Sequence, residues 1–301
     1  MNWFLASLIA PFVWSFVNHA DKLILSRYFH GTGSGGLMIF AGIVAAPIAI
    51  LIAFYETAVL SVTPHNAAIL IASGILYNVA VYFYLKVLEK HDASYVVPFW
   101  QLVPVCAYVF GILLLSEYMA FEKLFGGAIV IAGAVLLSTQ FGKKRTSLDI
   151  RSIGLMTLSS ATLALGYVLF KDADSTPFWP ALFWNQVGMT IFGVVFFLIP
   201  AFRREFLDVI RENSTAVLGL NVVEQVFEII GVAAANFAVL LAPAAMVVLV
   251  EYSFQPLFVF LFGIVFTLLF PKIVREDISR ATLLQRIIAI AIMAGGLALV
   301  V

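Results

Sequence analysis

The stretch that decides the fold is VVPFWQLVPVCAYVFGILLLSE, residues 96–117. A second stretch of the same character, VVLVEYSFQPLFVFLFGIVFTLLF, occupies residues 247–270 in the other half of the chain. The two align with Pro104 opposite Pro256, each within a long apolar run. Similarity of this kind between the two halves of a chain indicates an internal repeat.

The segments that follow these stretches extend the repeat. FGGAIVIAGAVLLS (125–138) follows the first stretch and IIAIAIMAGGLALV (287–300) follows the second, with Gly133 opposite Gly295. The loop before the last segment is longer in the second half of the chain. The sequence therefore predicts two copies of one unit.

The composition places both copies in a membrane. Of the 301 residues, 63% are hydrophobic and only 11% are charged, and the mean hydropathy is +1.06. A soluble domain is about half apolar and about a quarter charged. Apolar runs of about 20 residues, enough to cross a hydrocarbon core about 30 Å thick, recur along the whole chain. We therefore expect an all-α polytopic protein of the cell membrane, specifically the bacterial inner membrane.

The apolar windows predict ten transmembrane helices, five in each copy. Because no basic n-region precedes the first window, we expect a membrane helix there rather than a removable signal peptide. The breaks carry turn or charge signals, such as GTGSGG at 31–36 and RREF at 203–206. Five is an odd number, so the two copies must lie in the membrane with opposite orientation, as inverted repeats. The predicted helices cover residues 3–27, 35–54, 67–88, 94–115, 121–139, 153–170, 179–200, 216–239, 244–269 and 282–300.

The basic residues predict how these helices are oriented. Of the 17 lysines and arginines, only Lys123 and Lys171 lie near the even-numbered loops. Cytoplasmic loops carry an excess of lysine and arginine, so we expect the odd-numbered loops in the cytoplasm and both termini outside it. The basic residues at the odd-numbered loops are Lys22, Arg27, Lys86, Lys90, Lys143, Lys144, Arg145, Arg151, Arg203, Arg204, Arg211, Lys272, Arg275, Arg280 and Arg286.

The polar composition argues against several other classes of function. The net charge is zero, so no basic excess points to a nucleic acid. The single cysteine, Cys106, excludes a disulfide within the chain. The four histidines are scattered without metal-ligand spacing, and no glycine-rich loop ends in Gly-Lys-Ser/Thr. We expect no enzymatic activity, no metal and no cofactor.

Two stretches of the first half resemble those of a known family. ASYVVPFWQLVPVCAYVFGILLLSE (93–117) carries prolines in the middle of its apolar run and ends on the acidic Glu117. With the segment that follows it, this stretch resembles the EamA domain of the drug/metabolite transporter superfamily. The opening PFVWSFVNHADKL (11–23) is similar to the first helix of that family, with the expected residues at Trp14, Asn18 and Lys22.

The resemblance covers nearly the whole chain and implies its organisation. It implies one EamA-like repeat over residues 1–139, a basic linker over 140–151 and a second repeat over 152–301. Such a protein is a ten-helix carrier of small organic solutes, with a central cavity lined mainly by helices 1, 3, 4, 6, 8 and 9. Two features depart from the family. FTLLFPKIVRED (266–277) replaces the Leu-Ser-Glu ending in the second half. Many family members are described with cytoplasmic termini, whereas the basic residues here predict the reverse.

The most informative polar residues lie in NVVEQVFEIIG (221–231), which places Glu224 and Glu228 four residues apart. A charged side chain in mid-membrane costs roughly 2.5 to 3.5 kcal/mol on insertion scales, so it calls for a function. Two ionised carboxylates at this spacing on one helix repel each other. At low dielectric at least one of them should bind a proton or face a cation. Alternatively, Glu224 reaches the cytoplasmic interface and Glu228 is a protonated hydrogen-bond donor between helices.

Two further ionisable residues complete the set of candidates. Glu251 lies about a third of the way into the ninth predicted helix and either takes part in coupling or simply faces the same polar core. Lys22, beside Asp21 near the inner end of the first helix, either pairs with a substrate carboxylate or a glutamate or extends to the interface.

Polar and aromatic residues on other helices are candidates for lining the cavity. Tyr77, Tyr84, Trp100 and Tyr252 are candidate aromatic walls for a cation or a ring. Pro104 and Pro256 are candidates for kinking their helices in the middle and serving as gates. The substrate-binding or coupling residues we expect are Glu228, Glu224, Glu251, Asn78, Tyr84, Trp100, Gln101, Asn18, Lys22 and Tyr167.

Together these features predict a secondary-active transporter that works by alternating access. Its substrate is a small polar or amphipathic metabolite of amino-acid or amine type, and a proton is a candidate coupling ion. The expected partners are this solute and membrane lipid, and the protein is a monomer or a homodimer. The alternatives are a lipid flippase and a membrane enzyme or subunit that transports nothing.

Overall fold

The computed structural model describes residues 2–27, 34–91, 96–138, 149–173, 175–269 and 279–301, and the elements within these ranges are helical throughout. Each helix begins or ends near the sequence breaks that carry turn or charge signals. In chain order the described helices are α1 (Trp3–Ser7), α2 (Ile9–Arg27), α3 (Ser34–Tyr55), η1 (Thr57–Ser61), α4 (Pro64–Leu88), η2 (Val97–Gln101), α6 (Leu102–Leu115), α7 (Phe121–Ser138), α8 (Ile150–Asp172), α9 (Phe178–Leu198), α10 (Pro200–Glu212), α11 (Thr215–Val239), α12 (Ala244–Leu269) and α13 (Arg280–Val300).

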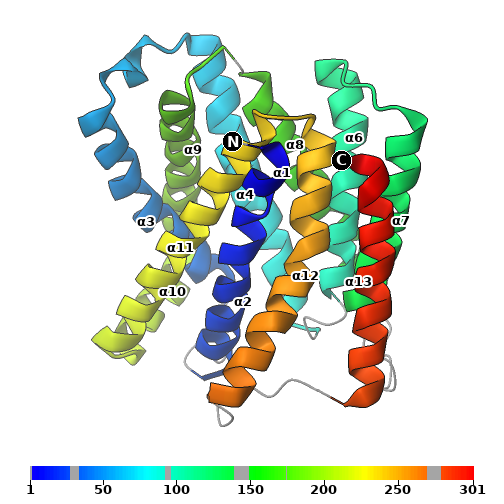
Figure 1. The fold of residues 1–301 in the computed structure, drawn as a ribbon. Helices are drawn as coiled ribbons and strands as arrows, with labels where there is room; N and C mark the ends of the chain where they lie inside the picture. Colours follow the sequence, from blue (N-terminus) through cyan, green and yellow to red (C-terminus); the bar gives the residue numbers. More distant parts are fainter. Residues whose placement is uncertain (1, 28–33, 92–95, 139–148, 174, 270–278) are drawn as a thin grey trace.

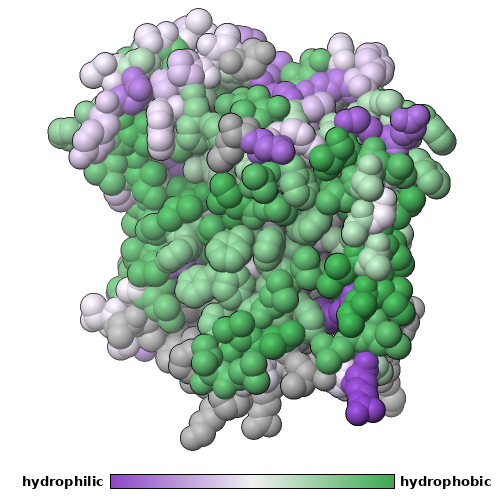
Figure 2. Space-filling view, in the orientation of Figure 1, coloured by the Kyte–Doolittle hydropathy of each residue, from purple (hydrophilic) through white to green (hydrophobic). Residues whose placement is uncertain are grey.

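In the described ranges, eight segments are long and apolar enough to cross a membrane. The first, Trp3–Ala20, combines α1 with most of α2, because the helix predicted over 3–27 is interrupted at Leu8. An apolar helical segment at Phe99–Leu115 is shorter. The helices run side by side, and both termini lie at the same end (Figure 1). Figure 2 shows hydrophobic residues across the middle of the visible face and most hydrophilic residues near its upper and lower edges. The protein is therefore a multi-pass membrane protein.

Two of the closest helix pairs meet at glycines. A Cβ atom added to Gly42 on α3 would lie 2.7 Å from the Cα atom of Gly193 on α9, and the reverse distance is the same. A Cβ atom on Gly126 of α7 would lie 2.7 Å from the carbonyl oxygen of Gly296 on α13, and again the reverse is the same. Small residues of this kind let helix backbones approach closely in a membrane, where packing drives association.

One predicted break is a helix. The charged residues around 203–206 were interpreted as a loop, but they belong to the amphipathic helix α10. Its apolar face buries Phe206 and Val209 in a cluster with Phe40 of α3, while Arg203 and Arg204 are exposed. Charged residues interrupt an apolar window without interrupting the 3.6-residue period of a helix, which explains the error.

The helix predicted over 94–115 is also wrong in one respect. Val97–Gln101 form the 3-10 helix η2, and the α-helix begins at Leu102. Pro104 is therefore in the first turn of α6, where a backbone N–H has no intrahelical partner in any case. The prediction that Pro104 kinks the middle of a helix is incorrect. Pro256, in contrast, does lie inside α12.

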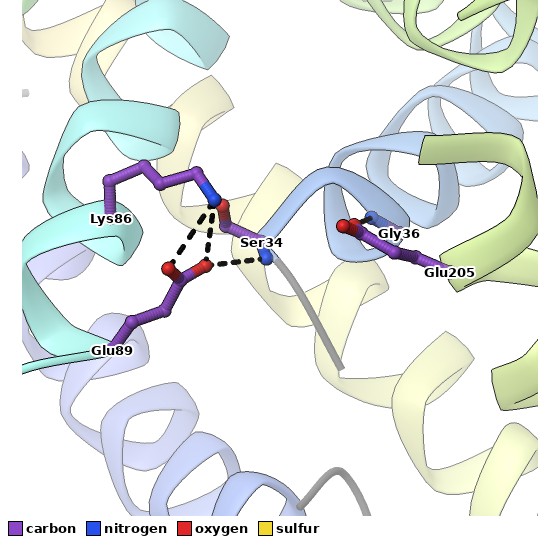
Figure 3. Close-up of polar contacts among 5 residues, drawn as sticks. All are labelled: Ser34, Gly36, Lys86, Glu89 and Glu205. Atoms are coloured by element: carbon purple, nitrogen blue, oxygen red, sulfur yellow. Dashed lines mark hydrogen bonds and ion pairs between the residues drawn. The ribbon is translucent and has the colours of Figure 1, made fainter. Parts of the chain in front are cut away.

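The beginning of α3 is held by two carboxylates from other helices (Figure 3). Glu89, just after α4, accepts a hydrogen bond from the backbone N–H of Ser34 at 2.9 Å and from the Lys86 ammonium at 3.0 Å. Glu205 of α10 accepts one from the backbone N–H of Gly36 at 3.3 Å. The first N–H groups of a helix lack intrahelical partners and carry partial positive charge, so carboxylates stabilise this end.

Candidate functional site

A cavity of about 120 Å³ lies between helices from both halves of the chain. The lining comes from α2, α3, α4 and η2 in the first half and from α8, α9, α11 and α12 in the second. α3 and α9 correspond to the second and seventh predicted helices, which were not among those expected to line the cavity. The described residues with polar groups in the lining are Trp14, Asn18, Tyr77, Asn78, Tyr84, Trp100, Asn221, Glu224, Gln225, Glu228, Tyr252 and Gln255.

The cavity lies toward one end of the helix bundle. It is lined by the beginning of α3 (residues 37–41), the second half of α4 (77–85) and the first half of α11 (221–228). These parts of the helices point toward the end of the bundle opposite the two termini (Figure 1). At this end α2, α4 and α12 end and α3 and α13 begin (Figure 1).

Glu228 and Glu224 line the cavity together from α11 and have different partners. Glu228 accepts a hydrogen bond from the phenol of Tyr77 on α4. Glu224 lies one turn earlier, is 3% exposed, and accepts a hydrogen bond from Gln225 Nε2 at 2.8 Å. The spacing places both carboxylates on one helix face. The hydrogen bond from Tyr77 links Glu228 to α4.

Four aromatic rings form a continuous series along the cavity, which we call the aromatic wall: Tyr84, Trp100, Tyr252 and Trp14. The ring centroids of Tyr84 and Trp100 are 5.1 Å apart, and those of Trp100 and Tyr252 are 5.7 Å apart in a stacked arrangement. Trp14 continues the series, with its ring 6.1 Å from that of Tyr252. The four rings come from α4, η2, α12 and α2, so one surface joins elements distant in sequence.

Gln101, Tyr167 and Glu251 lie outside the lining of this cavity. Gln101 donates through Nε2 to the backbone oxygen of Tyr252 at 2.8 Å and accepts from the Ser253 hydroxyl at 3.3 Å, so it fixes α12 against η2. The Tyr167 hydroxyl lies 3.3 Å from that of Tyr252. Glu251 is 0% exposed, and in the described part of the chain neither carboxylate oxygen has a hydrogen-bond partner.

The remaining predicted residues differ in their positions. Asn18 lines the cavity from α2. Asn78 also lines it and donates to the backbone oxygen of Met189 at 3.2 Å, which joins α4 to α9. The side chain of Lys22 lies outside the described residues.

An ion pair joins three helices near the opposite end of the bundle. The Lys171 ammonium, at the end of α8, lies 2.5 Å from the Glu117 carboxylate, and both side chains are 17% exposed. Glu117 also accepts a hydrogen bond from the backbone N–H of Ala244 at the beginning of α12, at 3.0 Å. Lys171 donates to the backbone oxygen of Ala242 at 2.5 Å. The ends of α6, α8 and α12 are thus tied together beyond the cavity.

Comparison with known proteins agrees with this architecture. The model of the EamA-like transporter family matches residues 1–139. The first half of the chain is thus similar to an EamA-like domain. A solved crystal structure shares the fold with a TM-score of 0.67 at 14% sequence identity, over 99% of this chain and 95% of that one. No curated protein matches the chain. The match confirms the resemblance to this transporter family over residues 1–139.

The part of the chain that the EamA-like model matches supplies only part of the cavity, because both carboxylates come from α11 in the second half. Four polar lining residues were missed from the sequence: Trp14, Asn221, Gln225 and Gln255. Trp14 Nε1 and Asn221 Oδ1 are buried and, among the described residues, have no hydrogen-bond partner. Asn221 is three residues before Glu224 and seven before Glu228. That spacing repeats on one helix face and is a signal that could have identified it.

Proposed function

We propose that this protein is a secondary-active transporter of a small polar or amphipathic metabolite, of amino-acid or amine type. One observation carries the proposal. The cavity is lined from both halves of the chain toward one end of the bundle, while the Glu117–Lys171 pair ties helices together at the other end. A site between two halves that is closed on one side is what alternating access requires.

Helix packing supports the proposal that the two halves are inverted five-helix repeats, in which α2, α3, α4, α6 and α7 correspond to α8, α9, α11, α12 and α13. Exchanging the two sets turns the α4–α8 packing into α11–α2, and α6–α8 into α12–α2; all four contacts are present. The α3–α9 and α7–α13 pairs are unchanged by the exchange. Trp100 and Tyr252, four residues before Pro104 and Pro256 respectively, stack on each other.

The distribution of charge supports an orientation with both termini outside the cytoplasm. Of the 17 lysines and arginines, 15 belong to the odd-numbered loops or to the helix ends beside them. Both termini lie together at one end of the bundle (Figure 1). With this orientation the cavity faces the cytoplasmic half of the membrane, and the Glu117–Lys171 pair lies on the outer side.

Proton coupling through Glu228, together with Glu224 or Glu251, is part of the proposal. Glu228 contacts both the cavity and, through Tyr77, helix α4. A carboxyl group in that position senses a solute and a helix movement at the same time. Buried acidic residues of this kind serve as proton relays in membrane transporters.

Reconstitution tests the proposal directly. Purified protein in liposomes should exchange a labelled amine or amino acid for unlabelled solute across the membrane, with rates that saturate at high concentration. Protein-free liposomes are the control. If no solute of a broad metabolite panel moves, while lipids are flipped or chemically altered, the proposal is wrong and one of the lipid-directed alternatives holds.

A further inference from the structure

We infer that the cavity binds a small organic ammonium ion, recognised by the aromatic wall and the carboxylate of Glu228. This inference names a substrate class for the proposed transporter, and it therefore rests on that proposed function. It draws on four features of the cavity: the rings, the carboxylate, an unpartnered acceptor and the volume.

The aromatic wall is the first feature. Tyr84, Trp100, Tyr252 and Trp14 all line the cavity and form one unbroken series of rings, with neighbouring centroids 5.1, 5.7 and 6.1 Å apart. The faces of aromatic rings carry partial negative charge and attract cations, and tryptophan does so most strongly. Two of the four rings here are tryptophans.

The carboxylate of Glu228 is the second feature. It accepts the hydrogen bond of the Tyr77 phenol through one oxygen, Oε1. A carboxylate has two oxygens that accept hydrogen bonds, so Oε2 can still accept one from an ammonium group. A phenol that donates to the carboxylate also fixes its orientation without adding a positive charge. A cation that enters the cavity therefore meets an oriented anionic acceptor.

Asn221 supplies the third feature. Its Oδ1 atom is buried and has no hydrogen-bond partner among the described residues, and the residue is 2% exposed. Asn221 lines the cavity two turns before Glu228, on the same helix. A buried acceptor without a partner is unfavourable, and because neighbouring atoms cover it, a ligand donates a hydrogen bond to it only after the Asn221 side chain turns toward the cavity. An ammonium group carrying N–H bonds is such a ligand.

The volume limits the size of the ligand. The cavity measures about 120 Å³. For comparison, an apolar cavity of about 150 Å³ accommodates benzene. Scaled from benzene's six non-hydrogen atoms, a ligand that fills the cavity has about five or six, which fits a short alkylammonium ion.

Three probes of nearly equal shape separate charge from size: isopentylamine, isopentanol and isovalerate. At neutral pH they carry one positive charge, no charge and one negative charge respectively. Titration calorimetry with the purified full chain should give a dissociation constant for isopentylamine about tenfold or more below that of isopentanol. Isovalerate should bind more weakly than either. Equal binding of the amine and the alcohol, or tightest binding of isovalerate, would overturn the inference.

Variants connect the binding to named residues. Glu228→Gln keeps the shape of the side chain. It should raise the dissociation constant of isopentylamine about tenfold and leave that of isopentanol unchanged. Trp100→Leu should lower the affinity for isopentylamine about fivefold. Trp100→Phe keeps a ring and should retain most of the affinity. The matched controls are Glu122→Gln and Trp179→Leu, two exposed residues away from the cavity, and both should bind as the wild type does. Wild-type affinity in folded Glu228→Gln and Trp100→Leu would contradict the inference.

The two proposals fail in different ways. If isopentylamine binds selectively but no labelled solute exchanges across the liposome membrane (no counterflow), the ammonium site stands and the proposed transport function is wrong. Counterflow of other solutes without selective binding of isopentylamine leaves transport intact and removes the ammonium site.

Discussion

Among single residues, Glu228 is the one on which the proposed proton coupling depends. Glu228→Gln keeps the size of the side chain and an oxygen that accepts from Tyr77, but an amide neither binds nor releases a proton near neutral pH. We expect this variant to exchange solute at saturating concentration and to lose accumulation driven by a pH gradient. Parallel assays in proteoliposomes, with and without an imposed pH gradient, measure the difference.

The same assays need a carboxylate that lies away from the cavity. Glu122 is exposed at the beginning of α7, so Glu122→Gln should retain gradient-driven accumulation. Full gradient-driven accumulation by Glu228→Gln would show that this residue does not couple transport to protons.

Glu89 gives a prediction about stability and pH. Burial alone would raise the pKa of Glu89, but hydrogen bonds from Ser34 and Lys86 outweigh it and hold the pKa below its ordinary value of 4.5. A carboxyl group whose pKa is lowered by folding stabilises the fold above the unfolded pKa, and this contribution is lost as the pH falls through the folded pKa. Because Glu89 is about a third exposed, its contribution is at most about 1 kcal/mol.

The measurement is the thermal midpoint of Glu89→Gln and wild type over a range of pH. The variant should melt a few degrees lower at neutral pH, and the gap should narrow as the pH falls below about 4.5, the ordinary pKa of Glu89. A gap of constant size down to strongly acidic pH would mean that the effect comes from packing rather than from the charge.

The residues of the site were only partly predictable from the sequence, for a physical reason. Carboxylates in the middle of a membrane helix are costly, so Glu224 and Glu228 could be identified without a structure. The rotation of a helix about its axis decides which neighbours face them. Trp100 and Gln101 are adjacent, yet Trp100 lines the cavity and Gln101 binds the backbone of α12. A helix that is apolar all round has no pattern that reveals this rotation.

Among the helices, the α3–α9 pair depends on the absence of side chains at its crossing. Gly42→Ala would place a methyl group 2.7 Å from the Cα atom of Gly193, so we expect a loss of about 1–3 kcal/mol of stability. Gly154→Ala on α8 is the matched control, because nothing lies within 4 Å of its added Cβ atom. Thermal unfolding in detergent should show a lower midpoint for Gly42→Ala only. Equal midpoints for Gly42→Ala and Gly154→Ala would mean that α3 and α9 accommodate the added methyl group without a loss of stability.

The ion pair between α6 and α8 should also be measurable. Lys171→Met leaves the Glu117 carboxylate without its cation at a position only 17% exposed, so the loss should reach up to about 3 kcal/mol. Lys86→Met is the comparison, because its pair with Glu89 joins residues three apart at the end of α4 and is 31% and 34% exposed. About 1 kcal/mol at most is expected there. If the two variants have the same thermal midpoint, the Glu117–Lys171 pair adds no more than an ordinary surface pair.

The sequence predicted apolar helices better than amphipathic ones. The helix predicted over 244–269 coincides with α12 (Ala244–Leu269). A long apolar run in a membrane must form a helix, because only then are all its backbone polar groups hydrogen-bonded. α10 was missed because its charged face interrupts the hydropathy while its buried face contacts α3. The start of α6 was misplaced because Val97–Gln101 are apolar enough to extend the run. Hydropathy carries no information on whether a turn is α or 3-10.

At the scale of the whole molecule, the decisive prediction is orientation. The distribution of basic residues predicts that the C-terminus lies outside the cytoplasm, whereas the resemblance to EamA proteins implied the reverse. A fluorescent protein fused after Val301, of a kind that matures only in the cytoplasm, should be dark, and alkaline phosphatase at the same position should be active. The same reporters inserted into the basic linker at 140–151 should give the opposite pattern and serve as the internal control. A bright C-terminal fusion with an active phosphatase in the linker would reverse the orientation. The cavity would then face the outer half of the membrane, because it lies toward the end of the bundle opposite the two termini (Figure 1).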